Sequence, residues 1–137
     1  MRRIVAILTG VIIAGCAIEG AWYIAERWFP APLSPDASIN DMLAHFVTRM
    51  PLGGQALIAI GWLLAGLAGG FVALRISQWR PSGWIVLVFV LGVAAWDLSQ
   101  LAHPWWLTGA TILLPILGCW LAERHFHRAR PGDPLIN

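Results

Sequence analysis

Four long apolar stretches dominate the pattern of hydrophobic and polar positions along the chain. They cover residues 4–25, 53–74, 84–101 and 105–121. Each is close to the roughly 20 residues that a helix needs to cross the hydrocarbon core of a bilayer. In lipid, only a helix satisfies the backbone of an isolated apolar segment. The pattern therefore predicts an all-α membrane protein, a bundle of four transmembrane helices.

The segment between the first two stretches predicts a further, shorter helix. Pro30, Pro32 and Pro35 favour an extended backbone, and Ser38 with Asp41 offers an N-terminal helix cap. Apolar residues then recur at steps of three and four, as on one face of a helix: Ile39, Met42, Leu43, Phe46, Val47 and Met50. We expect an amphipathic helix over residues 38–50 that lies on the outer surface.

Composition and charge agree with one membrane domain over residues 1–137 that ends in a basic tail, residues 122–137. Charged residues make up only 12% of the chain, against about 25% in soluble domains. The net charge of +2 is too small to indicate a nucleic-acid partner.

The distribution of arginines predicts the orientation. Seven of the nine lie at the N-terminus, between the second and third stretches, or in the tail, and two lie on the other side. Basic residues collect on the cytoplasmic side of membrane proteins. We therefore expect a bacterial inner-membrane protein with both termini in the cytoplasm.

The two cysteines leave one alternative open. Ile13-Ala14-Gly15-Cys16, behind a basic start, is similar to a lipoprotein signal that ends in a lipidated cysteine. The apolar run continues beyond Cys16, which favours an uncleaved transmembrane helix. Cys16 and Cys119 are expected at different depths, so no disulfide and no thiol-oxidoreductase role is predicted.

Glu19 and Asp97 are the acidic residues inside the predicted spans. Both fall in the outer third of the membrane, because they lie at similar distances along helices that run in the same direction. A lipid-exposed carboxylate would cost about 2–3 kcal/mol or more, so each should face the bundle or a wet crevice. They predict either a proton-linked or cation-binding site, or neutral carboxyl groups that hydrogen-bond neighbouring helices.

Further polar residues suggest an intramembrane pocket that opens outward. Tyr23 lies one turn from Glu19, and Gln100 lies near the face of Asp97. His45, His103 and Trp105 would form its outer rim. His45 and His103 are the weak candidates for a metal site, but no ligand spacing supports one. No catalytic residue, metal ion or other cofactor is therefore predicted.

Small residues predict close helix packing in the second span. Gly61, Gly66, Gly69 and Gly70 make this helix smooth, and Gly66-x-x-x-Gly70 is a common packing pattern. The glycines serve either packing within the four-helix bundle or the seam of a homodimer.

The chain also resembles a widespread group of small hypothetical four-helix bacterial membrane proteins. The likeness extends to about Leu121 and rests on Glu19 and four short motifs: Pro30-Ala31-Pro32, Met50-Pro51, Gly69-Gly70-Phe71-Val72-Ala73 and His103-Pro104-Trp105-Trp106. The resemblance implies a self-contained membrane unit with polar features on its outer side, and it implies no particular activity.

Three classes of function remain open. The first is an accessory, assembly or interaction component whose partners are the bilayer and either another copy or a larger membrane protein. The second is a small proton-linked or ion/solute carrier that uses Glu19 and Asp97. The third is a metal-binding membrane protein that uses His45 and His103.

Overall fold

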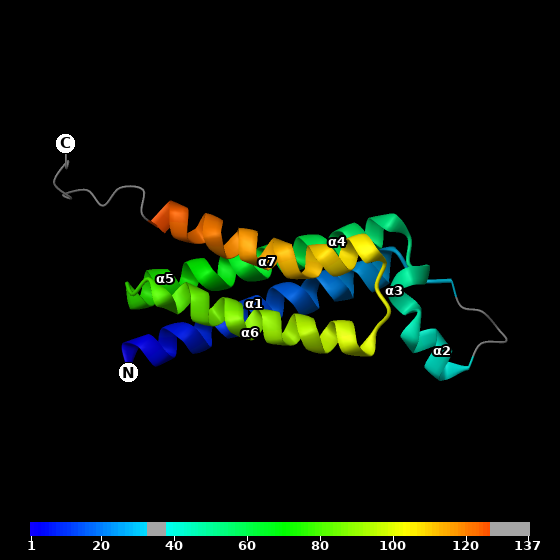
Figure 1. The fold of residues 1–137 in the computed structure, drawn as a ribbon, viewed down its shortest axis with the longest axis horizontal. Coiled ribbons are helices and arrows are strands. Elements are labelled where there is room, and N and C mark those ends of the chain that lie inside the picture. Colours follow the sequence, from blue (N-terminus) through cyan, green and yellow to red (C-terminus); the bar gives the residue numbers. More distant parts are fainter. Residues whose placement is uncertain (33–37, 127–137) are drawn as a thin grey trace.

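The computed structural model describes residues 1–32 and 38–126, and helices make up most of this part of the chain (Figure 1). In chain order they are α1 (Arg2–Trp28), α2 (Ile39–Ala44), α3 (Phe46–Arg49), α4 (Leu52–Leu64), the π-helical turn η1 (Ala65–Gly69), α5 (Gly70–Ser77), α6 (Pro81–Gln100) and α7 (Trp105–Phe126). No strand occurs among the described residues.

Within the described residues, four helices are long and apolar enough to cross a membrane, which indicates a multi-pass membrane protein. They are α1, the continuous helix Leu52–Ser77 made of α4, η1 and α5, then α6 and α7. The prediction of an all-helical chain with four apolar helices is therefore confirmed. Each helix extends beyond the predicted apolar stretch at one end at least, because a helix can continue into a polar turn that hydrophobicity does not reveal. Helix α1 ends at Trp28, shortly before Pro30.

The two ends of the bundle differ in character (Figure 1). The start of α1, the connection between α5 and α6, and the end of α7 lie together at what we call the basic end. Helices α2 and α3 lie at the opposite, capped end, beside the connection between α6 and α7. The start of α1 and the end of α7 therefore lie at the same end of the bundle, as expected for a chain that crosses a membrane four times.

The helix formed by α4, η1 and α5 is the most enclosed of the four. In its most apolar stretch 56% of the residues are buried, against 22% in α1. Trp62 and Ile58 of α4 pack in the core with Val86 and Val90 of α6. Helix α1 lies against α4 and α5, and α7 lies against η1 and α4. Much of α1 consequently remains exposed on the outside of the bundle.

The predicted packing glycines lie at contacts between helices of this same chain. Gly66 lies directly against the backbone of Pro115 in α7, and Gly61 lies against Ala21 in α1. A Cβ atom added to Gly69 would lie 2.7 Å from the carbonyl oxygen of Gly10. The nearest atom to a Cβ on Gly70 would be Cys119 Sγ, at 3.5 Å. These contacts favour packing within the bundle over a homodimer seam.

The predicted amphipathic helix over residues 38–50 is divided into α2 and α3 at His45. Its predicted cap is confirmed, because Ser38 Oγ accepts a hydrogen bond from the Asp41 amide at 3.2 Å and donates to its carboxylate at 2.7 Å. On the C-terminal side of this division, α3 is held by α4. The buried Gln55 amide donates to the carbonyls of Val47 and Met50, both at 3.0 Å, and thereby ties α3 to the bundle.

Candidate functional site

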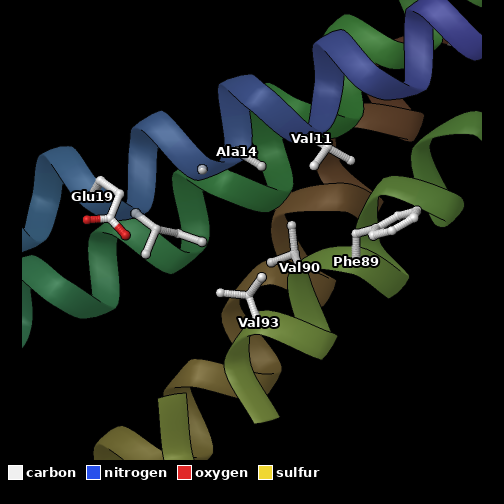
Figure 2. Close-up of a pocket in the computed structure, with 8 residues that line it drawn as sticks. Val11, Ala14, Glu19, Phe89, Val90 and Val93 are labelled. Carbon is white, nitrogen blue, oxygen red and sulfur yellow. The ribbon is translucent and has the colours of Figure 1, made fainter. Parts of the chain in front are cut away.

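A groove of about 130 Å³ lies between α1 and α6, and Glu19 stands at one end of it (Figure 2). Val11, Ala14, Gly15 and Ile18 line it from α1, and Phe89, Val90 and Val93 line it from α6. Figure 2 shows Val11 and Phe89 at the end away from Glu19. Apart from the carboxylate, the walls are apolar.

The Glu19 carboxylate is exposed, and among the described residues it forms no hydrogen bond or ion pair. Gly15, one turn earlier on α1, leaves the wall of the groove open. A Cβ atom added to Gly15 would meet no atom within 4 Å. The groove therefore has room for an apolar occupant beside a carboxylate that has no partner in this chain.

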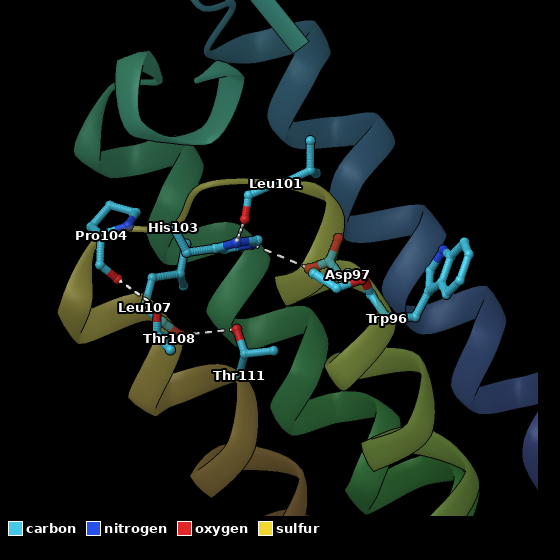
Figure 3. Close-up of polar contacts among 9 residues, drawn as sticks. Trp96, Asp97, Leu101, His103, Pro104, Leu107, Thr108 and Thr111 are labelled. Carbon is cyan, nitrogen blue, oxygen red and sulfur yellow. Dashed lines mark hydrogen bonds and ion pairs between the residues drawn. The ribbon is translucent and has the colours of Figure 1, made fainter. Parts of the chain in front are cut away.

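Asp97 and His103 form a separate polar contact at the capped end (Figure 3). Asp97 lies in the last turn of α6, and His103 lies in the short connection to α7. His103 Nε2 is 3.2 Å from Asp97 Oδ2, although the two groups are not aligned as a hydrogen bond. The His103 side chain is fully buried, whereas that of Asp97 is 17% exposed.

The His103 ring is fixed from both sides. Nδ1 is 2.9 Å from the carbonyl oxygen of Leu101, and a carbonyl can only accept, so Nδ1 carries hydrogen. Burial is the largest single influence on the pKa of His103 and lowers it. The contacts with Asp97 and with the Leu101 carbonyl together outweigh burial, so the pKa lies above its usual value of 6.5. These contacts therefore favour the protonated form of the imidazole.

The other predicted polar residues lie outside this contact. The side chain of Tyr23 is 71% exposed. Gln100 is also exposed, and its amide donates to Ser99 Oγ at 3.2 Å. At the predicted rim, Trp105 and His45 are both exposed. Of the predicted site residues, the structure thus brings together Asp97 and His103.

Glu19 belongs to different surroundings from Asp97, because α1 and α6 diverge toward the capped end (Figure 2). Val11 of α1 and Val90 of α6 line the groove together, but beyond Val93 the two helices separate. The similar depth of Glu19 and Asp97 along their helices was therefore not enough to predict that the two carboxylates share a pocket. The wall formed by Phe89, Val90 and Val93 was not predicted, because apolar residues in an apolar helix carry no distinguishing signal.

Within residues 1–32 and 38–126, no three His, Cys, Asp or Glu side chains are grouped as metal ligands would be. Cys16 and Cys119 are both free, Cys16 exposed and Cys119 buried.

Comparison with known proteins adds no relative: no protein family matches the chain, and neither the curated proteins nor the solved structures contain a significant match.

Proposed function

We propose that this chain is a multi-pass protein of a bacterial inner membrane, with its basic end in the cytoplasm. The proposal is supported by the arginines, because basic residues favour the cytoplasmic side. The described arginines at the basic end are Arg2, Arg3, Arg75, Arg80 and Arg124, whereas Arg27 and Arg49 lie toward the capped end. This orientation places Glu19 in the outer part of the bilayer.

Within that membrane, the chain acts as an interaction component that binds a transmembrane helix of another protein along the groove between α1 and α6. The observation that carries this function is the exposed Glu19 carboxylate without a partner. Facing lipid, such a group costs about 2–3 kcal/mol or more. A helix that brings a hydrogen-bond donor or a cation to Glu19 removes that cost.

The shape of the groove supports a helix as the occupant. Gly15 leaves room for a backbone to come close, which is how small residues favour association of membrane helices. Val11, Phe89 and Val93 offer apolar contact along the same face. A second copy of this chain is a poorer occupant, because docking groove against groove would bring two Glu19 carboxylates together.

The carrier alternative has less support. The helix backbones touch at Gly66 and Pro115 and come within van der Waals contact at Gly10 and Gly69. These contacts leave no space for a solute between those helix pairs at that depth. Asp97 and His103 can bind a proton, but Glu19 lies in different surroundings. A proton relay between the two carboxylates is therefore not the function we propose.

Photo-crosslinking from α6 tests the partner site in cells. A photoreactive residue at Val93 lies in the groove, whereas one at Val88, which is even more exposed on the same helix, does not line it. We expect Val93 alone to crosslink to a transmembrane helix of a second protein. Glu19→Leu should reduce the yield about 3- to 30-fold, as expected for loss of one hydrogen bond within a membrane, and Glu19→Gln should preserve it.

A steric pair of variants separates docking from folding. Gly15→Leu fills the groove and should abolish the crosslink, while Gly92→Leu, at an equally open glycine outside the groove lining, should leave it intact. Removing the donor on the partner helix should have the same effect as Glu19→Leu. The proposal would be disproved if Val88 crosslinked as well as Val93, or if Gly15→Leu left the crosslink unchanged. A crosslinked product that contains only two copies of this chain would also disprove it.

A further inference from the structure

A second recess lies at the basic end, between the beginning of α6 and the last turns of α7. It is lined by Arg80, Trp120, Glu123 and Arg124, has a volume of about 320 Å³ and is open to the surroundings. It shares no lining residue with the groove around Glu19. The proposed partner site therefore leaves this recess without a role.

The recess carries more positive than negative charge. Arg80 Nε is 3.5 Å from Glu123 Oε1, and the Trp84 indole N–H donates to Glu123 Oε2 at 3.0 Å. The single carboxylate thus interacts with Arg80 and Trp84. The Arg124 guanidinium lies 5.3 Å from the ring centre of Trp120. Two guanidinium groups offer ten N–H donors, many more than one carboxylate accepts, so an anion would find donors here.

An apolar stripe leads from the recess along the outside of α7. Leu113, Leu117 and Trp120 are exposed, and they precede Arg124 at steps of four, three and four residues. These steps place all four side chains on one face of the helix. The face therefore combines an apolar strip with a cation at its basic end, which matches the arrangement of acyl chain and phosphate in a phospholipid.

We propose that this recess binds the phosphate group of an anionic phospholipid, whose acyl chains lie along the α7 stripe. Arg80 and Arg124 hold the phosphate, Glu123 positions Arg80, and the indole ring of Trp120 lies where headgroup and chains meet. Basic pockets between transmembrane helices on the cytoplasmic side commonly bind such headgroups. The inference rests on the proposed membrane orientation but not on the proposed partner.

Native mass spectrometry of the purified full chain in neutral detergent tests this site without any partner protein. Short-chain phosphatidylglycerol is titrated against phosphatidylcholine, and we expect selective binding of the anionic lipid. Arg124→Gln should weaken it about fivefold, and the double variant Arg80→Gln/Arg124→Gln about 30-fold. Arg124→Gln leaves the contact between Arg80 and Glu123 in place, so it remains informative if the double variant does not fold.

Two sets of controls locate the effect. Arg27→Gln/Arg49→Gln changes the capped end, and Arg128→Gln/Arg130→Gln changes the tail beyond the described residues; both should retain lipid binding. Inorganic phosphate is the soluble alternative, and Leu117→Gln should weaken binding of the lipid but not of phosphate. The proposal would be overturned if either control pair weakened lipid binding as much as the double variant Arg80→Gln/Arg124→Gln does. It would also be overturned if inorganic phosphate displaced the lipid at comparable concentration.

Discussion

Glu19 and Asp97 show how two carboxylates of similar depth acquire different properties from their neighbours. Asp97 lies beside a fully buried histidine, whereas Glu19 is exposed and has no partner in the described chain. A residue contributes to stability only if folding changes its surroundings. Asp97 should therefore contribute to the stability of the bundle, and Glu19 should contribute to what binds the bundle.

Substitution of the two carboxylates should separate these roles. We expect Glu19→Leu to change the free energy of unfolding by no more than about 0.5 kcal/mol, as exposed substitutions usually do. Asp97→Asn should lower it by about 1–3 kcal/mol, because His103 loses a charged partner. Denaturant titration of the purified protein in mild detergent measures both. A larger loss for Glu19→Leu than for Asp97→Asn would contradict this division.

The contact between His103 and Asp97 should also make stability depend on pH. The pKa of His103 in the folded state lies above 6.5, so the protonated imidazole binds the folded state more strongly than the unfolded one. Its contribution is complete below about pH 6.5 and is lost as the pH rises through the folded-state pKa. Unfolding temperatures measured across this range should fall with rising pH.

The pH effect belongs to one histidine, and variants can assign it. Asp97→Asn removes the contacts with Asp97 that raise the pKa of His103 and leaves the opposing effect of burial in place. The fall of stability with rising pH should therefore be lost or reversed in this variant. His45→Asn changes an exposed histidine and should preserve the wild-type profile. If His45→Asn removed the pH dependence of stability and Asp97→Asn did not, the titrating group would not be His103.

The helices themselves meet through close backbone contacts, most directly where η1 and α4 approach α7. Gly66 lies against the backbone of Pro115, and Gly118 lies against the backbone of Leu63. Neither neighbour can move away as a flexible side chain could. Ordinary α-helical spacing is interrupted here by the π-helical turn η1, so helix geometry and helix packing are adjusted at the same place.

Adding one methyl group tests this contact. Gly66→Ala should lower the free energy of unfolding by about 1–3 kcal/mol, because the Cβ atom would overlap the Pro115 backbone. Gly92→Ala, where an added Cβ meets nothing within 4 Å, should have no effect or stabilise by up to about 1 kcal/mol. Equal effects of the two substitutions would show that the contact between η1 and α7 is not tight.

Sequence predicted these elements where the signal is local. Apolar length revealed the four long helices, and Ser38 with Asp41 revealed the start of α2. The division at His45 was not predictable, because it accompanies hydrogen bonds from Gln55 to Val47 and Met50 across a turn. The groove was not predictable either, since the angle between α1 and α6 depends on packing throughout the bundle.

For the whole molecule, the arrangement of ends connects the separate features. The basic end contains the arginines and the recess at Arg124, and the capped end contains α2, α3 and His103. Glu19 lies between them, on a helix of which little is buried. In the proposed orientation, the proposed lipid site faces the cytoplasm, while the proposed partner site and the contact between His103 and Asp97 lie toward the opposite side.

Measurement of topology tests that orientation directly. Tags at the two termini should both be protected in intact spheroplasts, and a tag inserted beside Pro32 should be accessible from outside, because four crossings return the chain to the arginine-rich side.

Replacing Arg2 and Arg3 with glutamine should leave the orientation unchanged, since Arg75, Arg80 and Arg124 remain at the basic end. Adding arginines beside Pro32 while neutralising those three as well should invert a fraction of the molecules. If the termini were found on opposite sides of the membrane, the chain could not cross it four times. If the tag at Pro32 were protected and the termini were accessible, the proposed lipid site would lie on the outer side and the proposed partner site toward the cytoplasm.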